Sequence, residues 1–523
     1  MNSQEVLKIC LEKGLLLDRE ILNLFSEIND LNSIRLILDK VTICTQRKVI
    51  TREVFYENKH QISTFFFDLP KESQKNLENF KIKLGLNLEI LNEAENNLDI
   101  IEDSDSDISH IKINNPINLT DKKPDISYFV KNFRNRFSEI RNILQEHQEL
   151  DNLVSINKIV GDRQKLSLIG MIFSKKITKN NNILFEIEDL TGKIRVLING
   201  NKKELYEQAE ELTLDSVVGF KGSGNKEIIF ANEIILPESK IAELKRAPLD
   251  ELALFIGDLH FGSKLFLKKS FLKFIDYLNG NLPNTPEVNK IKYLFIVGDV
   301  VTGVGNYPNQ EKDLEILDLE EQFIKLAELL GKIRKDITII ISPGNHDGVR
   351  IMEPQPCLDE KYAWPLYDLD NVILTQNPSE INIASSRNFS GFNILTYHGF
   401  SFPYYADNVS TLMKKKAMNS PEDIMKYLLK VRHLAPSYKS TQFFPFEQDA
   451  LVIRNVPDIF VSAHTHKSGI SLYNNILIIS VSSWEGATPY QEKMGAEPDF
   501  CKVPMFNLKT REIKILDFEE SGN

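Results

Sequence analysis

Apolar residues recur at helical spacing over residues 125–150 of the chain. Five large apolar residues follow one another there at spacings of 4, 4, 3 and 4: Phe129, Phe133, Phe137, Ile140 and Leu144. Positions three and four apart lie on the same side of an α-helix, so these side chains would form one apolar face. The pattern predicts an amphipathic helix that packs against another part of the protein.

The pattern changes to short strands between residues 151 and 245. Five apolar runs of strand length are separated by turns rich in asparagine and glycine: 166–174, 183–189, 193–199, 216–221 and 227–236. Asparagine and glycine favour the tight turns that connect strands. A helical stretch near 202–212 interrupts the series. Five strands with one intervening helix predict an OB-fold β-barrel.

Residues 246–523 alternate buried strands with helices, as α/β domains do. Six apolar runs carry this pattern: Leu252–Ile256, Tyr293–Val297, Ile337–Ile341, Ile394–Tyr397, Asp458–Ser462 and Ile476–Val481. Almost every run is followed by a polar cluster that contains Asp, Asn or His. Because open α/β sheets bind ligands at the carboxyl ends of their strands, we expect a metal or substrate site there.

The pattern is weaker before residue 125. Residues 1–90 predict a small helical domain, in which Val6, Ile9 and Cys10 share an apolar face and Gly14 ends the helix. Its role is open between a partner- or DNA-binding module and an accessory bundle. Residues 91–124 are polar, acidic and without periodicity, which is typical of a linker.

The composition indicates the cellular environment in which we expect the protein. No stretch of the 523 residues approaches the roughly 20 apolar residues that a membrane span needs. The first residues lack the basic and apolar segments of a signal peptide, so we expect a cytoplasmic protein without membrane association. Four widely spaced cysteines with no CxxC pair argue against a disulfide framework: Cys10, Cys44, Cys357 and Cys501.

The net charge of −11 argues against a free-standing DNA-binding protein, which is usually basic. Part of the acidic excess is local, because five carboxylates occur within nine residues: Asp99, Glu102, Asp103, Asp105 and Asp107. Bound divalent cations would also add positive charge where a phosphate would lie. A partner subunit could supply further basic surface.

Five short motifs follow the predicted strands and contain metal-binding residue types: Gly257-Asp258-Leu259-His260-Phe261-Gly262, Gly298-Asp299-Val300-Val301, Gly344-Asn345-His346-Asp347, His398-Gly399 and Ala463-His464-Thr465-His466. A lone Asp-x-His is a weak signal, because most such pairs are surface or capping residues. The ordered set is specific, since five of the six histidines between 260 and 466 fall in motifs. Carboxylate, amide oxygen and imidazole without thiolate favour Mn²⁺, Fe²⁺ or Zn²⁺ over Ca²⁺.

These motifs resemble the calcineurin-like metallophosphoesterase superfamily, whose fold is a four-layer α/β/β/α sandwich. The order of helical domain, linker, OB barrel and phosphoesterase resembles the small, exonuclease subunit of archaeal family-D DNA polymerase. The resemblance is specific from about 150 to 510, and three further stretches carry it: Pro354-Gln355-Pro356, Arg432-His433-Leu434-Ala435-Pro436, and Trp484 with Thr488, Tyr490 and Gln491.

The resemblance implies two divalent metal ions, with Mn²⁺ as the first expectation and Fe²⁺ or Zn²⁺ as alternatives. The two implied ligand sets share Asp299 as a bridge: Asp258, His260, Asp299 and His466 for one metal, and Asp299, Asn345, His398 and His464 for the other. His346 would stay off the metals and donate a proton to the leaving oxygen. Asp347 would orient a ligand or His346.

Four positions depart from the usual pattern of the resembled family, and none of them removes a ligand. Gly257 stands for a serine, Ala463 for a glycine, Thr302 for an aspartate and Phe400 for a basic residue. Phe400 removes a positive charge beside a ligand, which predicts weaker contact with phosphate.

The resemblance implies a 3′–5′ proofreading exonuclease for single-stranded DNA, working at the nucleoid as one half of a heterodimer. Its partners would be the large catalytic polymerase subunit and single-stranded or primer–template DNA. Five basic residues of the predicted barrel could contact this DNA, or else form a solvated surface: Lys175, Lys176, Lys179, Lys193 and Arg195.

Two other functions compete with this interpretation. The first is a non-catalytic scaffold subunit, as in eukaryotic replicative polymerases, whose related small subunits have lost ligands. The second is a stand-alone metallophosphatase that acts on small substrates. The seven implied ligands and His346 are all present, which favours catalysis, and the attached barrel argues against a stand-alone phosphatase.

Overall fold

The computed structural model describes residues 110–114, 125–161 and 164–520, with scattered positions among the first fifty. The chain divides into two compact units, residues 1–105 and 106–523. In the first unit, β1 (Leu16–Leu17) and β2 (Val49–Ile50) pair in parallel. Val6, Ile9 and Cys10 are buried there, as the predicted apolar face requires. Gly14 and most of the predicted helical domain lie outside the described residues.

A strand occurs inside the segment that composition predicts as a linker. β3 (His110–Asn114) pairs antiparallel with β13 (Ser379–Ser385) at the edge of a sheet. Its pattern is short, with Ile111 and Ile113 alternating between polar residues, so the sequence shows no clear strand signal. Residues 110–114 of the predicted linker are therefore part of a sheet of the second unit.

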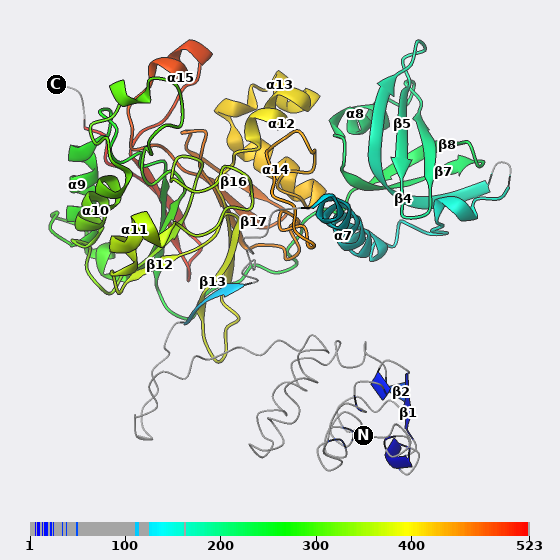
Figure 1. The fold of residues 1–523 in the computed structure, drawn as a ribbon, viewed down its shortest axis with the longest axis horizontal. Coiled ribbons are helices and arrows are strands. Elements are labelled where there is room, and N and C mark those ends of the chain that lie inside the picture. The colour runs from blue at the N-terminus through cyan, green and yellow to red at the C-terminus, as the bar shows by residue number, and fades with distance from the viewer. Residues whose placement is uncertain are drawn as a thin grey trace. The chain divides into compact units, whose positions relative to one another are not determined.

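The predicted strands of residues 151–245 form a closed five-stranded barrel in the order β4-β5-β6-β8-β7 (Figure 1). Its strands are β4 (Gln164–Ile177), β5 (Ile183–Glu188), β6 (Lys193–Ile198), β7 (Val217–Gly224) and β8 (Ile228–Ile235). The short helix η1 (Ile156–Lys158) precedes them, and α8 (Lys203–Glu211) lies between β6 and β7. Alternate residues of β5 are buried, which places Ile183, Phe185 and Ile187 in the barrel core.

The predicted amphipathic helix is α7 (Ile126–Gln145), which begins at Asp125, whose side chain accepts a hydrogen bond from the Ser127 amide. Phe137, Ile140 and Leu144 are buried against barrel residues and against Val452 of the following domain. The helix therefore packs between the barrel and the α/β region that follows it, as its apolar face predicts.

Two six-stranded sheets make up the rest of the second unit. The first has the order β12-β11-β10-β9-β18-β19: β9 (Leu252–Gly257), β10 (Ile291–Val297), β11 (Thr338–Ser342), β12 (Val372–Leu374), β18 (Lys502–Asn507) and β19 (Ile513–Asp517). The second has the order β16-β17-β15-β14-β13-β3: β14 (Phe392–Tyr397), β15 (Ile459–Ser462), β16 (Gly469–Tyr473) and β17 (Ile476–Ser480), with β13 and β3. Strands β9 to β12 are parallel, as are β14, β15 and β17.

The two sheets share one apolar core, in which Phe255 and Phe295 of the first sheet lie with Ile394, Val461 and Ile479 of the second. Three helices pack on the first sheet: α9 (Lys268–Leu278), α10 (Leu319–Leu330) and α11 (Glu360–Tyr367). Three others pack by the second: α12 (Phe402–Asn408), α13 (Ser410–Lys414) and α14 (Pro421–Val431). Figure 1 shows the strands of this region between the two helix groups.

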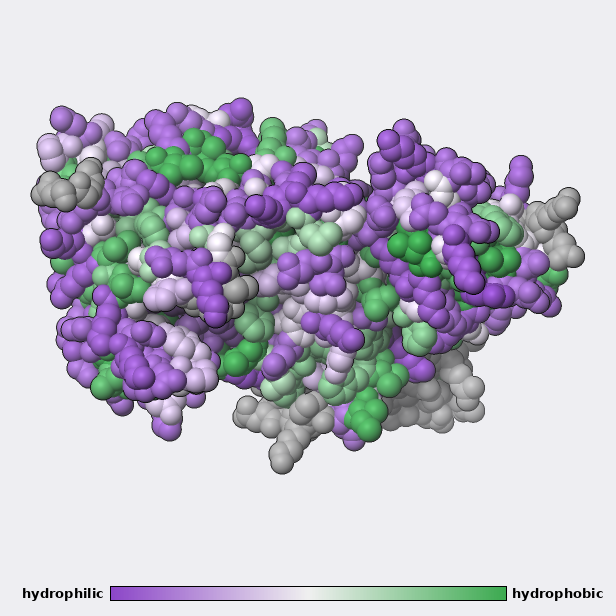
Figure 2. Space-filling model, turned by 90° about the horizontal axis from the view of Figure 1, so that it is seen from above, coloured by the Kyte–Doolittle hydropathy of each residue, from purple (hydrophilic) through white to green (hydrophobic). Residues whose placement is uncertain are grey.

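The remaining short helices lie in the connections of this region: η2 (Pro286–Lys290), η3 (Gln310–Lys312), η4 (Ala417–Asn419) and α15 (Pro489–Met494). None of the helices among the described residues combines the length and apolarity that a bilayer crossing requires. The face in Figure 2 is mainly hydrophilic, with separate apolar patches between charged side chains.

Candidate metal centre

The seven predicted ligands all follow strands, and they come from both sheets. Asp258 directly follows β9, Asp299 follows β10 and Asn345 follows β11, while His398 follows β14 and His464 follows β15. These five strands are parallel within their sheets, so their carboxyl ends meet at one edge. His260 and His466 lie two residues beyond Asp258 and His464.

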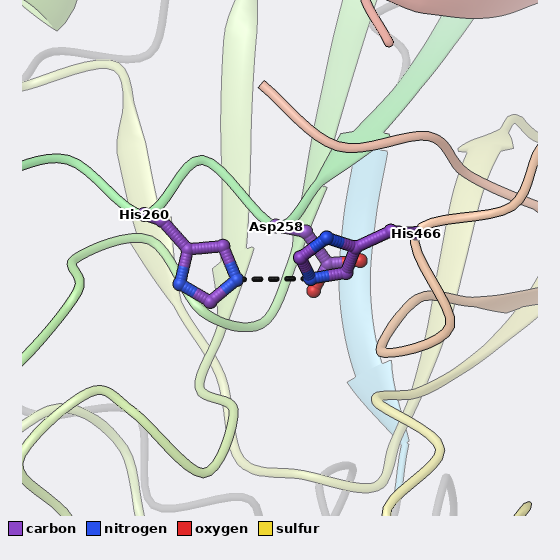
Figure 3. A group of neighbouring side chains, drawn as sticks. All are labelled: Asp258, His260 and His466. Atoms are coloured by element: carbon purple, nitrogen blue, oxygen red, sulfur yellow. Dashed lines mark hydrogen bonds between the residues drawn. The ribbon is translucent and has the colours of Figure 1, made fainter. Parts of the chain in front are cut away.

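The first ligand group consists of Asp258, His260 and His466, whose ligand atoms lie within 4.8 Å of one another. Figure 3 shows the two imidazoles facing each other beside the carboxylate, and their Nε2 atoms are 3.1 Å apart. The Oδ1 oxygen of Asp258 is buried and has no hydrogen-bond partner. A buried carboxylate oxygen without a donor is costly, and a cation would satisfy it, so the donor set fits a metal ion.

The second ligand group consists of Asp299, His398 and His464. The Nε2 atom of His398 lies 3.2 Å from Oδ2 of Asp299 and 3.2 Å from Nδ1 of His464. The amide oxygen of Asn345 lies 3.0 Å from the same nitrogen. Oδ2 of Asp299 is also 3.9 Å from Nε2 of His260, so this carboxylate stands between the two groups.

The backbone at the centre is strained. Five predicted ligands have left-handed φ angles: Asp258 at 46°, His260 at 47°, Asp299 at 47°, His464 at 68° and His466 at 57°. A residue with a side chain pays on the order of 1–2 kcal/mol for this conformation. Such strain persists where the surrounding structure enforces it, and it clusters at functional sites. The motifs show which residues are present, but their sequence does not show this strain.

Two motif glycines let the ligands approach one another. A Cβ atom at Gly298 would lie 2.1 Å from Nδ1 of His398, and one at Gly344 would lie 2.3 Å from Oδ1 of Asp299. Gly298 also has a φ of 74°. Any larger residue at either position would displace a predicted ligand.

Electrostatics prepares four of the predicted ligands for a cation, while two others differ. Burial lowers the pKa of His260 to about 3 and holds the pKa values of His464 and His466 well below their usual range. Burial would raise the pKa of Asp299, but His398 and the other histidines hold it well below its ordinary value. Three neutral imidazoles around an ionised carboxylate are in the protonation state that metal binding requires. Burial would lower the pKa of His398, but the charge of Asp299 outweighs burial and raises this pKa to about 9, and burial raises the pKa of Asp258, so a cation would have to displace protons from these two side chains.

Comparison with known proteins agrees with this geometry. Residues 253–468 match the family model described as calcineurin-like phosphoesterase. The chain is 36% identical over 439 residues to the DNA polymerase II small subunit of Pyrococcus furiosus, covering 81% of this chain and 70% of that protein. The chain belongs to the DNA polymerase II small subunit family.

A second member of the family gives a similar match. The DNA polymerase II small subunit of Methanothermobacter thermautotrophicus is 34% identical over 398 residues, which cover 75% of this chain and 80% of that protein. The predicted family is therefore confirmed, and its phosphoesterase domain implies divalent metal ions. Among solved structures, an archaeal phosphodiesterase gives a TM-score of 0.26 at 11% identity, covering 51% of this chain and 98% of that chain. That likeness is too low to carry an argument.

His346 lies against Asp299 in this family member. Its backbone amide donates to Oδ1 of Asp299 at 2.8 Å. Its ring Nδ1 lies 2.9 Å from the carbonyl oxygen of Thr302 and 3.1 Å from Nδ2 of Asn306. A ring nitrogen also lies within 4.8 Å of ligand atoms of His260 and Asp299. The geometry is thus compatible with the predicted proton donor and with a metal ligand, and the predicted role stays a prediction.

Asp347 connects the loops that carry two ligands. Its Oδ1 accepts from the amide of Val301 at 2.9 Å, and its Oδ2 accepts from the amide of Gly344 at 2.7 Å. Burial raises its pKa to about 7. These two hydrogen bonds position the loops after β10 and β11, so Asp347 supports the predicted ligands through their backbone.

The sequence did not reveal the residues that hydrogen-bond to the predicted ligands and to the loops that carry them. Asn377 accepts a hydrogen bond from the His398 amide at 2.9 Å and donates to Gln355 at 2.7 Å. Gln355 in turn donates to the carbonyl oxygen of Gly344 at 3.1 Å. Nε2 of Gln491 lies 2.8 Å from Nδ1 of His466. Gln355 and Gln491 belong to two of the three stretches that carry the family resemblance, so both stretches contact the ligands or their loops. The side chain of Tyr490 lies outside the described residues.

The five basic residues of the barrel are not equally available. Lys175 donates to the carbonyl oxygens of Glu210 and Leu212 at 2.7 and 3.0 Å, and burial lowers its pKa to about 8. Lys193 pairs with Glu188 at 3.0 Å, and Arg195 lies 3.9 Å from Glu227. Lys176 and Lys179 are exposed and form no ion pair with the part of the chain that the structure describes. These two are the best placed to meet a phosphate.

Proposed function

We propose that this chain is the small subunit of a replicative DNA polymerase and a two-metal 3′–5′ exonuclease on single-stranded DNA. The observation that carries this proposal is that Asp299, a member of the second ligand group, lies 3.2 Å from His398 and also 3.9 Å from His260 of the first group, at the carboxyl ends of the strands. Its relatives are named small subunits, so the partner would be a large catalytic subunit, and the complex would work at the nucleoid.

The chemistry follows from the positions of this chain's own residues. Asp258, His260 and His466 would hold one divalent ion, and Asn345, His398 and His464 the other, with Asp299 as the bridge. Two such ions, when bound, clamp the attacking and leaving oxygens of an in-line displacement. With both ring nitrogens of His346 protonated, Nδ1–H would donate a hydrogen bond to the carbonyl oxygen of Thr302, and Nε2–H would give its proton to the leaving oxygen, which leaves the ring neutral. Mn²⁺ is the metal we expect first.

The finer fold assignments belong to the same proposal. The barrel order β4-β5-β6-β8-β7, with α8 between its third and fourth strands, supports an OB fold. Two sheets that share a core and carry helices on their other faces support a four-layer sandwich. The domain boundaries near residues 90, 124, 150 and 245 are part of this proposal.

Two alternatives predict different activities. A scaffold subunit would bind the large subunit and hydrolyse nothing, although the seven ligands and His346 are intact here. A stand-alone phosphatase would prefer small phosphate esters, although a closed barrel is attached to this domain.

The test is an assay of the purified full chain with Mn²⁺ on two substrates. One is 5′-labelled single-stranded DNA, and the other is p-nitrophenyl phosphate. We expect metal-dependent shortening of the DNA from its 3′ end and little ester hydrolysis. Ester hydrolysis alone would indicate a phosphatase, and no hydrolysis of either substrate would indicate a scaffold.

A further inference from the structure

An aromatic ring stands beside the second ligand group. The ring of Phe400 lies 5.6 Å from the ring of His464, centroid to centroid, with the two planes at 67°. Phe400 is only partly buried, so part of its ring stays open to solvent next to a predicted metal ligand.

A second exposed ring belongs to the loop that contacts His346. Asn306 contacts Nδ1 of His346 at 3.1 Å, and the next residue, Tyr307, is 43% exposed. The hydroxyl of Tyr307 donates to Asp313 at 2.9 Å, which fixes the direction of the ring. Val304, in the same loop, is 47% exposed.

The loop that carries Tyr307 is built around two buried glutamines. Gln310 accepts from the Asn306 amide at 2.8 Å and donates to the carbonyl oxygen of Thr302 at 3.0 Å. Gln322 accepts from the Gly303 amide at 3.0 Å. Both glutamines are almost completely buried, so the loop holds an apolar ring in solvent at a fixed place.

Among the described residues, the charges that shift the pKa values of the predicted ligands are those of histidines and aspartates, and no lysine or arginine is among them. Lys467 directly follows His466, but its Nζ faces Asp499 at 3.4 Å. Phosphate contact would therefore fall to the metal ions, and the surrounding side chains offer aromatic faces instead. Base–aromatic stacking contributes on the order of 1–3 kcal/mol per base and does not depend strongly on which base is present.

We propose that Phe400 and Tyr307 stack on nucleobases on either side of the metal centre, so that the site selects unpaired nucleotides by their bases. In a duplex, each base face is covered by its neighbours, so only single-stranded or frayed ends offer free faces to these rings. This inference rests on the proposed phosphodiesterase function and adds how the substrate is recognised.

The test compares two single-stranded substrates on the metal-loaded full chain. One ends in ordinary nucleotides, and in the other the last two positions are abasic tetrahydrofuran analogues. We expect Phe400→Leu to lower the ratio of kcat/KM between the normal and abasic substrates about tenfold, the change that about 1.4 kcal/mol of stacking gives. Tyr307→Leu should act in the same direction, while Phe400→Trp should keep the ratio.

Trp364→Leu is the matched control, because Trp364 is 44% exposed on α11 and bonds to Glu320. It should leave the substrate ratio unchanged. Equal losses on both substrates would mean that Phe400 only positions His464, and an unchanged ratio in the leucine variants would also overturn stacking. If the wild type degrades neither substrate, the proposed function itself is wrong, and this inference fails with it.

Discussion

At the scale of single residues, the centre depends on Asp299. One of its carboxylate oxygens accepts the amide of His346, and the other lies 3.2 Å from His398 and 3.9 Å from His260. A single side chain thus contacts members of both ligand groups and the candidate proton donor. Both metal occupancy and the position of His346 should depend on this carboxylate.

Asp299→Asn should remove both metals, because an amide keeps the size of the side chain but cannot provide a bridging carboxylate. Elemental analysis of the wild type should find close to two divalent ions per chain. The variant should bind far less of both. Asp313→Asn is the control, because Asp313 is an exposed carboxylate in a neighbouring loop. Full metal content in Asp299→Asn would disprove the bridging role.

His346→Ala separates the two roles that the geometry leaves for this histidine. As a proton donor, its loss should reduce hydrolysis by about 10²-fold or more while both metals remain bound. The measurement pairs the rate on single-stranded DNA with elemental analysis of the same preparation. Loss of metal would show that His346 is a ligand, and a rate equal to wild type would show that it has no part in the reaction.

At the scale of elements, what could be predicted depended partly on burial. The six predicted strands of the α/β region are covered on both faces, so they read as continuous apolar runs. Strands β3, β16 and β19 lie at sheet edges with mixed exposure, and β12 has three residues, so no pattern revealed them. Burial does not account for β13 and β18, which are mostly buried inside their sheets and were still not predicted. The motifs stood out because they follow the predicted strands, and the family resemblance then implied which of their residues are ligands. The support by Gln355 and Asn377 was not predictable, because it joins distant loops.

Helix α7 is held by a buried ion pair. Nε of Arg136 lies 2.7 Å from Oδ2 of Asp449, and Nε2 of His433 lies 3.1 Å from the same oxygen. Arg136 also donates to the carbonyl oxygen of Pro436. His433 and Pro436 of the Arg432–Pro436 stretch therefore take part in the contacts that join helix α7 to the phosphoesterase domain.

Arg136→Met should destabilise the protein by about 3–5 kcal/mol, because it leaves the carboxylate of Asp449 buried without its cation. Urea unfolding of the full chain measures this change. Lys131→Met on the same helix is the control, since Lys131 pairs with Glu447 in solvent and should matter little. Similar effects of the two substitutions would contradict the role of the buried pair.

His433 should make stability depend on pH. Burial, followed by the charge of Arg136, lowers its pKa to about 4, whereas an unfolded histidine titrates near 6.5. Its contribution is complete above about pH 6.5 and is lost as pH falls toward 4, because only the unfolded chain takes up the proton. The slope is about 1.4 kcal/mol per pH unit for one proton. Urea unfolding between about pH 7 and pH 5 should show a shallower slope for His433→Phe than for wild type.

At the scale of the whole molecule, the net charge of −11 sets limits on how DNA is held. On the barrel, Lys175, Lys193 and Arg195 are engaged by protein groups, which leaves Lys176 and Lys179 for phosphate. Around the metal centre, the rings of Phe400 and Tyr307 replace charge with stacking surface. Such a chain should bind DNA through few ionic contacts, and a large subunit would have to provide the others.

The dependence of DNA binding on salt tests this view. For single strands, the slope of log K against log salt is about −0.7 per phosphate neutralised. The isolated chain should therefore show a shallow slope, and its complex with the large subunit a steeper one. Replacing Lys176 and Lys179 with Gln should reduce the slope of the isolated chain by about 1.4, which is two contacts, without changing its metal content. The matched control replaces Lys268 and Lys269, two adjacent exposed lysines on α9. A steep slope that the barrel substitutions leave unchanged would mean that DNA does not follow this face of the barrel, and that its two free lysines are only solvated surface.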